Sequence, residues 1–201
     1  TRGSMTAARK LTVYDPRADG ARCDVCPLKH STPVPSTSVR RAKFAVVGEA
    51  PGRREEQEGE SFIGPSGKLL NRVLKDAGLE REEAYVGNTV LCRPDSDDAL
   101  AKAQHCCAPR LFKELEALPV DAPILALGAH AAKQLLGVRS ILRTRGFVWR
   151  VPELDKDAKA KLKTTLKGKG RKGVMARRGA RLRLLRQKVA GRIVFPTLHP
   201  A

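Results

Sequence analysis

The ten residues Lys43-Phe44-Ala45-Val46-Val47-Gly48-Glu49-Ala50-Pro51-Gly52 decide the fold. An apolar run from Lys43 to Val47 enters a turn that holds two glycines and a proline. This pattern predicts a buried strand that ends in a functional loop. The acidic stretch from Glu55 to Glu60 follows the loop.

Helical and strand patterns alternate along the rest of the chain. A helix is predicted from an N-cap at Ser66 to Gly78, because its leucines and valines recur at helical spacing. A short helix is expected from Ala129 to Leu136, and His130 on it is interpreted as a structural or surface residue. Further strands are predicted over residues 84–92, 123–127, 147–151 and 192–198. This order indicates a three-layer α/β/α domain with a mostly parallel sheet, in which ligands bind beyond the carboxyl ends of the strands.

Charge is concentrated in one segment. The 201 residues carry 39 Lys and Arg against 21 Asp and Glu, a net charge of +18. Between Lys156 and Arg192 there are 15 basic residues and one acid, Asp157, so this segment alone contributes +14. We expect a single domain of residues 5–201, in which residues 153–191 form a basic flexible insertion. This insertion would contact the phosphates of a polyanion, although a solvated loop would have the same composition.

No run approaches the roughly 18 apolar residues of a membrane-spanning helix, and no secretory signal is evident. We therefore expect a cytoplasmic protein, a monomer that does not bind membranes. Residues 1–4 resemble a remnant of cloning.

Four of the five cysteines have the spacing of a metal site. Cys23 and Cys26 are separated by two residues, Cys92 follows after 65 more, and Cys107 after another 14. Four thiolates suit tetrahedral zinc or an iron–sulfur cluster, and the spacing does not separate the two. Cys106 is an alternative fourth ligand, as are, less favourably, His30 and His105.

Several motifs resemble the iron–sulfur uracil-DNA glycosylases of family 4. They are the segments 48–52, 59–64 and 67–70, Asn88 before Cys92-Arg93-Pro94, and His199-Pro200. Their order and spacing match over about residues 20–150 and again over 192–201. The resemblance implies a [4Fe-4S] cluster rather than zinc, and it favours Cys107 over Cys106 because Pro109 follows Cys107 by two residues.

The resemblance implies a monofunctional DNA repair hydrolase that flips uracil out of single- or double-stranded DNA and cleaves its N-glycosidic bond. Such a site must stabilise negative charge on the departing base. His199 would donate a hydrogen bond to that base, and Glu49 would orient the water. The remaining site residues fall into two sets: Gly48, Ala50, Pro51, Gly52, Phe62 and Asn88 would contact the uracil, and Lys167, Lys169, Arg171, Lys172, Arg177 and Arg178 would contact DNA phosphates.

Two departures from the family pattern keep other functions open. Ala50 stands where better-known glycosylases of the superfamily have an aspartate that positions the water, and the sequence ends soon after His199. The alternatives are a non-catalytic DNA-binding or replication-associated module with the same fold, and a glycosylase for another modified pyrimidine.

Overall fold

The computed structural model describes residues 14–37, 41–138, 140–167 and 173–197. The four residues interpreted as a cloning remnant lie outside these ranges, as do Lys169, Arg171, Lys172 and His199. Within the described ranges, no helix is long and apolar enough to span a membrane.

A five-stranded sheet in the order β2-β1-β3-β5-β4 forms the centre of the molecule. Its first four strands in that order run parallel, and β4 pairs antiparallel with β5 at one edge. The mostly parallel α/β sheet predicted from the sequence is thereby confirmed. The strands are β1 (Phe44–Gly48), β2 (Ala84–Asn88), β3 (Ile124–Leu127), β4 (Trp149–Arg150) and β5 (Ile193–Thr197).

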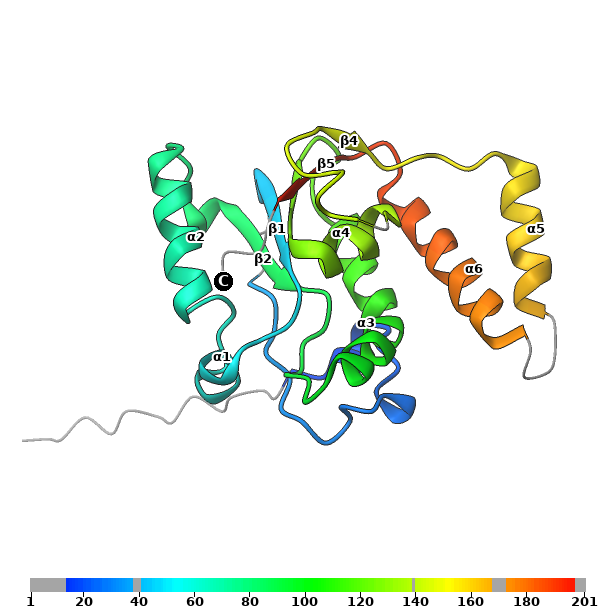
Figure 1. The fold of residues 1–201 in the computed structure, drawn as a ribbon, viewed down its shortest axis with the longest axis horizontal. Helices are drawn as coiled ribbons and strands as arrows, with labels where there is room; N and C mark the ends of the chain where they lie inside the picture. The colour runs from blue at the N-terminus through cyan, green and yellow to red at the C-terminus, as the bar shows by residue number, and fades with distance from the viewer. Residues whose placement is uncertain (1–13, 38–40, 139, 168–172, 198–201) are drawn as a thin grey trace, which may run out of the picture.

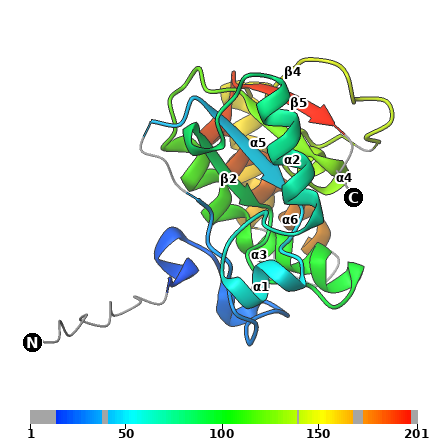
Figure 2. The same cartoon turned by 90° about the vertical axis from the view of Figure 1, so that its left-hand side faces the viewer.

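Helices cover both faces of the sheet (Figures 1 and 2). The α-helices are α1 (Arg53–Glu58), α2 (Pro65–Asp76), α3 (Asp97–Glu116), α4 (Gly128–Leu136), α5 (Lys156–Lys167) and α6 (Val174–Arg186). Short 3-10 turns occupy Pro16–Asp19, Cys23–Val25, Arg81–Glu83 and Gln187–Val189.

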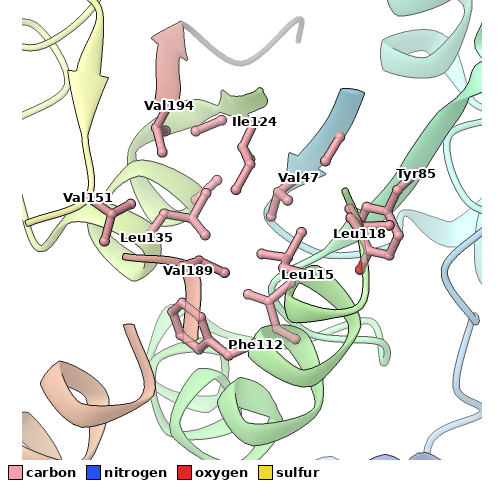
Figure 3. Close-up of a cluster of buried hydrophobic side chains, with 14 of the residues drawn as sticks. Val47, Tyr85, Phe112, Leu115, Leu118, Ile124, Leu135, Val151, Val189 and Val194 are labelled. Atoms are coloured by element: carbon pink, nitrogen blue, oxygen red, sulfur yellow. The ribbon is translucent and has the colours of Figure 1, made fainter. Parts of the chain in front are cut away.

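The alternation of side chains along β1 explains the three layers. Phe44 and Val46 lie in one buried cluster with Leu70 and Leu74 of α2. Ala45 and Val47 point to the opposite face, into a second cluster with residues of α3 and α4. In Figure 3, Val47, Ile124 and Val194 from three strands face Phe112 and Leu115 of α3 and Leu135 of α4.

The longest helix, α3, is predicted only in part, because the sequence indicates a helix that starts near Cys107. It begins at the N-cap Ser96, whose hydroxyl accepts a hydrogen bond from the amide of Ala99, and it continues through Pro109. Cys107 therefore lies in the middle of a helix and not near a helix start as expected. Proline and a run rich in alanine and cysteine hide the helical periodicity, but burial of Leu111, Phe112 and Leu115 against the sheet stabilises the helix.

Several predicted boundaries also shift. The N-cap of α2 is Gly64 with Pro65 at the first helical position, so Ser66 lies inside the helix. The strand predicted over residues 84–92 ends at Asn88, which places Cys92 beyond it. The strand predicted over 147–151 is reduced to Trp149–Arg150.

The basic insertion is more ordered than expected. Its described part contains α5 and α6, which pack against each other, and α6 also packs against α3. Leu182 and Leu185 of α6 contact the main buried cluster. A few leucines at helical spacing suffice to attach α6 to this cluster.

Candidate functional site

The loop after β1 forms one wall of a cavity of about 550 Å³. The cavity lies where β1 and β2 end, which is the position expected for a ligand site in a parallel sheet. Glu49, Ala50, Pro51 and Gly52 line it from the β1 loop, and Phe62 and Asn88 line it from two other segments. The structure thus brings together six of the residues that the sequence singled out.

The side chains of Phe62 and Asn88 both approach the backbone of β1 closely at Gly48. A Cβ atom added at this position would collide with the ring of Phe62 and would lie 2.6 Å from Oδ1 of Asn88. Only glycine lets the ring and the amide approach β1 so closely. The glycine of the loop motif therefore shapes the floor of the cavity.

Phe62 is held in a strained conformation. It is buried and has a positive φ of 58°, which costs a residue other than glycine about 1–3 kcal/mol. The Arg81 guanidinium donates to the carbonyl oxygens of Ser61 (2.6 Å) and Phe62 (3.3 Å). Gly67 is required here as well, since a Cβ atom would collide with the Phe62 carbonyl.

Glu55 fixes the same segment from the other side. Its buried carboxylate accepts hydrogen bonds from the amides of Ile63 (3.1 Å) and Gly64 (2.8 Å). A Cβ atom at Gly52 would lie 2.7 Å from this carboxylate, so the β1 loop and the Phe62 segment meet there. In the sequence, Glu55 cannot be distinguished from the neighbouring solvated acids. The only signal that the Glu55 carboxylate approaches the backbone closely is the pair of glycines at positions 52 and 64.

Asn88 ends β2 with its side chain in the cavity wall. It is 2% exposed, and among the described residues its Oδ1 atom has no hydrogen-bond partner. A buried acceptor without a partner is costly, which suggests that a ligand donor satisfies it. Its backbone carbonyl accepts from Nη2 of Arg110 (2.9 Å), a fully buried guanidinium that also pairs with Glu114 (3.0 Å).

Glu49 has a neighbour that the sequence did not indicate. Its carboxylate oxygen lies 3.9 Å from Nε2 of His130, the residue interpreted from the sequence as structural or on the surface. Nδ1 of that histidine lies 3.4 Å from Oε1 of Gln104, and Gln104 donates to the Thr89 hydroxyl (3.0 Å). That hydroxyl donates to the carbonyl of Glu49 (2.6 Å), so a polar chain returns to the β1 loop.

All five cysteines line a separate cavity of about 440 Å³. Every pair within Cys23, Cys26, Cys92 and Cys107 interacts electrostatically, which places these four thiols around one space. Burial is the main cause that raises the pKa of Cys92, to about 12. Burial also raises the pKa of Cys107, and the nearby Arg110 opposes that rise.

Cys106 lies at the edge of this group. Its thiol is hydrogen-bonded to that of Cys26, which lowers the pKa of Cys106 to about 7 and raises that of Cys26. It also interacts with Cys107.

The donor set is one that zinc and iron–sulfur clusters both use. A lone zinc would draw its sulfurs to about 3.8 Å from one another, as tetrahedral Zn–S bonds of about 2.3 Å require. In the described part of the chain, no group of three or more His, Cys, Asp and Glu residues is placed to hold a single metal ion. Cys26 and Cys107 are buried and Cys23 and Cys92 are partly exposed around this shared space, and four thiols are donors that an iron–sulfur cluster can take.

The described members of the predicted phosphate-binding set do not line the Glu49 cavity. Of the six, Lys167, Arg177 and Arg178 are described, and they belong to α5 and α6. In Figure 1 these helices lie to the right of α3, whereas α1 and α2 lie to its left.

Comparison with known proteins identifies the family. The model of the uracil DNA glycosylase superfamily matches residues 35–201. The chain belongs to this superfamily. Three similar relatives are each named type-4 uracil-DNA glycosylase.

The relative from Archaeoglobus fulgidus is 35% identical over 144 residues, which cover 69% of this chain and 71% of the relative. The one from Sulfurisphaera tokodaii is 34% identical over 129 residues, or 60% and 58% of the two chains. The one from Saccharolobus solfataricus is 32% identical over 146 residues, or 65% of each chain. This chain therefore spans between 58% and 71% of the length of these superfamily members.

Proposed function

We propose that the protein is a monofunctional uracil-DNA glycosylase, which flips uracil out of DNA and hydrolyses its N-glycosidic bond to leave an abasic site. The observation that carries the proposal is the buried Oδ1 atom of Asn88, which lacks a partner among the described residues, in a residue that lines the cavity together with Phe62. The names of the similar superfamily members support the same activity.

Recognition of the base follows from these two side chains. Phe62 offers a flat ring on which an extruded pyrimidine can stack. The Asn88 side chain presents one acceptor and one donor, which match the N3–H and O4 of uracil, whereas cytosine presents the opposite pattern. Because the acceptor is buried, the wrong base would leave it without a hydrogen bond. Such a mismatch lowers kcat/KM by about 10⁴-fold, which corresponds to several kcal/mol.

Cleavage leaves negative charge on the base, so donors at the cavity are the main requirement. The backbone N–H groups of Glu49, Ala50 and Gly52 and the side chain of His199 would supply them. Glu49 would orient the attacking water in place of the aspartate that Ala50 replaces. His130, 3.9 Å from the Glu49 carboxylate, would help to hold that carboxylate in position.

We propose that Cys23, Cys26, Cys92 and Cys107 hold a [4Fe-4S] cluster, with zinc as the alternative. Bound there, the cluster would supply structural cross-linking. It would join the segment around Cys23, the segment after β2 and the middle of α3. Arg110 lies next to Cys107 and holds the Asn88 carbonyl, so the cysteine site supports the cavity through one buried side chain.

We further propose that the basic residues Lys167, Lys169, Arg171, Lys172, Arg177 and Arg178 contact DNA phosphates. Each phosphate neutralised would increase affinity without regard to sequence.

The experiment is uracil release from a defined oligonucleotide by the wild-type chain and by Asn88→Asp. The variant replaces the side-chain donor with a second acceptor, so uracil release should fall at least a hundredfold and weak cytosine release can appear. Gln57→Glu makes the same amide-to-carboxylate change at an exposed position of α1 outside the cavity lining and should leave release unchanged. Full uracil release by Asn88→Asp would remove Asn88 from the proposed role, and a wild-type chain that binds DNA without releasing uracil would indicate the non-catalytic alternative.

A further inference from the structure

A third cavity, of about 640 Å³, lies between α6 and the segment that carries Cys23 and Cys26. Lys102, His105 and Cys106 of α3 contribute to its lining, so α3 separates it from α1 and the Glu49 cavity (Figure 1). Its size is within the range of about 300–1,000 Å³ that is usual for ligand sites.

Its lining is strongly basic. Six Lys and Arg residues from three separate parts of the chain surround it: Arg22, Lys29, Lys102, Arg177, Arg178 and Arg181. Among the described residues that line it, Asp24 is the only acid, and Asp24 is exposed and lies 3.8 Å from Arg17. The described lining of the cavity therefore gathers six basic residues and one acid.

The cations in this lining repel one another. After burial, the charge of Arg22 is the next cause that lowers the pKa of Arg181. Such an arrangement is unfavourable in the free protein and favourable once an anion lies between the cations.

Arg22 provides an independent sign of a missing partner. Its Nε atom is buried and has no hydrogen-bond partner among the described residues. A buried guanidinium donor normally meets an oxygen, and phosphate and carboxylate oxygens match its geometry best.

We propose that this cavity binds the phosphate groups of a DNA strand, as a second contact remote from the base-binding cavity. The inference rests on the proposed function for the identity of the polyanion. The cations come from residues 22–29, from α3 and from α6, a spread that suits successive phosphates of a strand better than one small anion. Leu166, Leu182 and Leu185 lie among them and offer apolar contact to the sugars.

The test uses the whole chain and an undamaged, labelled single-stranded oligonucleotide without uracil, so that base recognition plays no part. The double variant Arg178→Gln/Arg181→Gln should weaken binding about tenfold at low salt and reduce the slope of log affinity against log salt by about 2. The matched control is Lys161→Gln/Lys163→Gln, which removes two exposed charges from α5 outside the cavity. It should weaken binding about threefold or less. Circular dichroism of both variants checks that the helices remain folded.

Each other outcome overturns the proposal. Equal losses in the two double variants would mean diffuse attraction by the whole insertion, and no loss in either would mean that the cavity does not meet DNA. If inorganic tripolyphosphate binds and only its binding is weakened by Arg178→Gln/Arg181→Gln, the site serves a small phosphorylated ligand. Because the probe contains no uracil, absence of uracil release would contradict the proposed function alone and leave this measurement intact.

Discussion

The two sides of α3 are built in different ways. On the side of α1 and α2, the cavity around Phe62 and Asn88 is fixed by buried side chains and by glycines that admit no Cβ atom. On the side of α5 and α6, no residue of α5 is buried, and Ala180 is the one residue of α6 that is buried. The comparison suggests that the side of α1 and α2 positions the groups that act on the base. The side of α5 and α6 supplies positive charge that increases the affinity for DNA.

The largest expected effect concerns the cysteines, all of which line the metal-site cavity. Protein carrying the proposed cluster should show a broad iron–thiolate absorbance near about 400 nm. Cys107→Ala should abolish it, because Cys107 is buried amid the other three ligands.

Cys106→Ala, one residue away, is the matched control and should keep that absorbance. The reverse result would show that Cys106, and not Cys107, is the fourth ligand. A colourless wild-type protein that contains one zinc ion would show that the site holds zinc and not the cluster.

The next effect separates rate from affinity. His199→Ala should slow uracil release at saturating DNA by about a hundredfold or more, the usual effect of losing one donor to a developing oxyanion. Its affinity for DNA should change by less than about threefold, because the residue is proposed to act on charge that develops during cleavage. A large loss of affinity with an unchanged rate would assign His199 to binding.

The sequence motifs indicated the loop after β1 and helix α2 because several of their residues can be replaced by few others. Gly48 and Gly67 mark close approaches of the backbone, and Leu70 and Leu74 recur at the spacing of a helix that packs on a sheet. Glu55 was missed because an acid that accepts two backbone hydrogen bonds has the same local sequence as a solvated one. Arg81 and Arg110 were missed for a related reason, since their partners come from distant parts of the chain.

The side of α5 and α6 was predicted less well. Its composition indicated charge but not the packing of Leu182 and Leu185 against the core, which depends on where α3 lies. Removal of residues 156–188, the deletion that composition alone suggests, would therefore expose part of that core. Charge substitutions on α5 and α6 test phosphate binding without this damage.

A third prediction tests the close packing on the side of α1 and α2. Gly48→Ala should lower uracil release by about thirtyfold, since overpacking costs about 2 kcal/mol and here displaces the Phe62 ring and the Asn88 amide. Affinity for undamaged DNA should stay the same, because the basic helices are untouched. Wild-type release by this variant would mean that the ring and the amide can move away from β1 without consequence.

A smaller effect is expected at Glu55. Glu55→Gln keeps an oxygen acceptor near the amides of Ile63 and Gly64 but removes the charge that strengthens both hydrogen bonds. Loss of about 1.4 kcal/mol would lower kcat/KM about tenfold through a less ordered Phe62. The neighbouring Glu58→Gln, at an exposed position of α1, is the control and should leave kcat/KM unchanged. Equal values for the two variants would show that the Phe62 segment does not need the carboxylate.

The smallest effect should have the opposite sign, on the side of α5 and α6. A Cβ atom at Gly179 of α6 would meet no atom within 4 Å, so Gly179→Ala adds no overlap. Alanine in place of a glycine inside a helix stabilises it by up to about 1 kcal/mol, because the unfolded chain loses conformational freedom. Thermal unfolding should therefore shift upward by a few degrees while uracil release is unchanged, whereas Gly48→Ala should lower both. A drop in stability at Gly179 would mean that α6 is packed as tightly as the cavity side, and the contrast between the two sides of α3 would then fail.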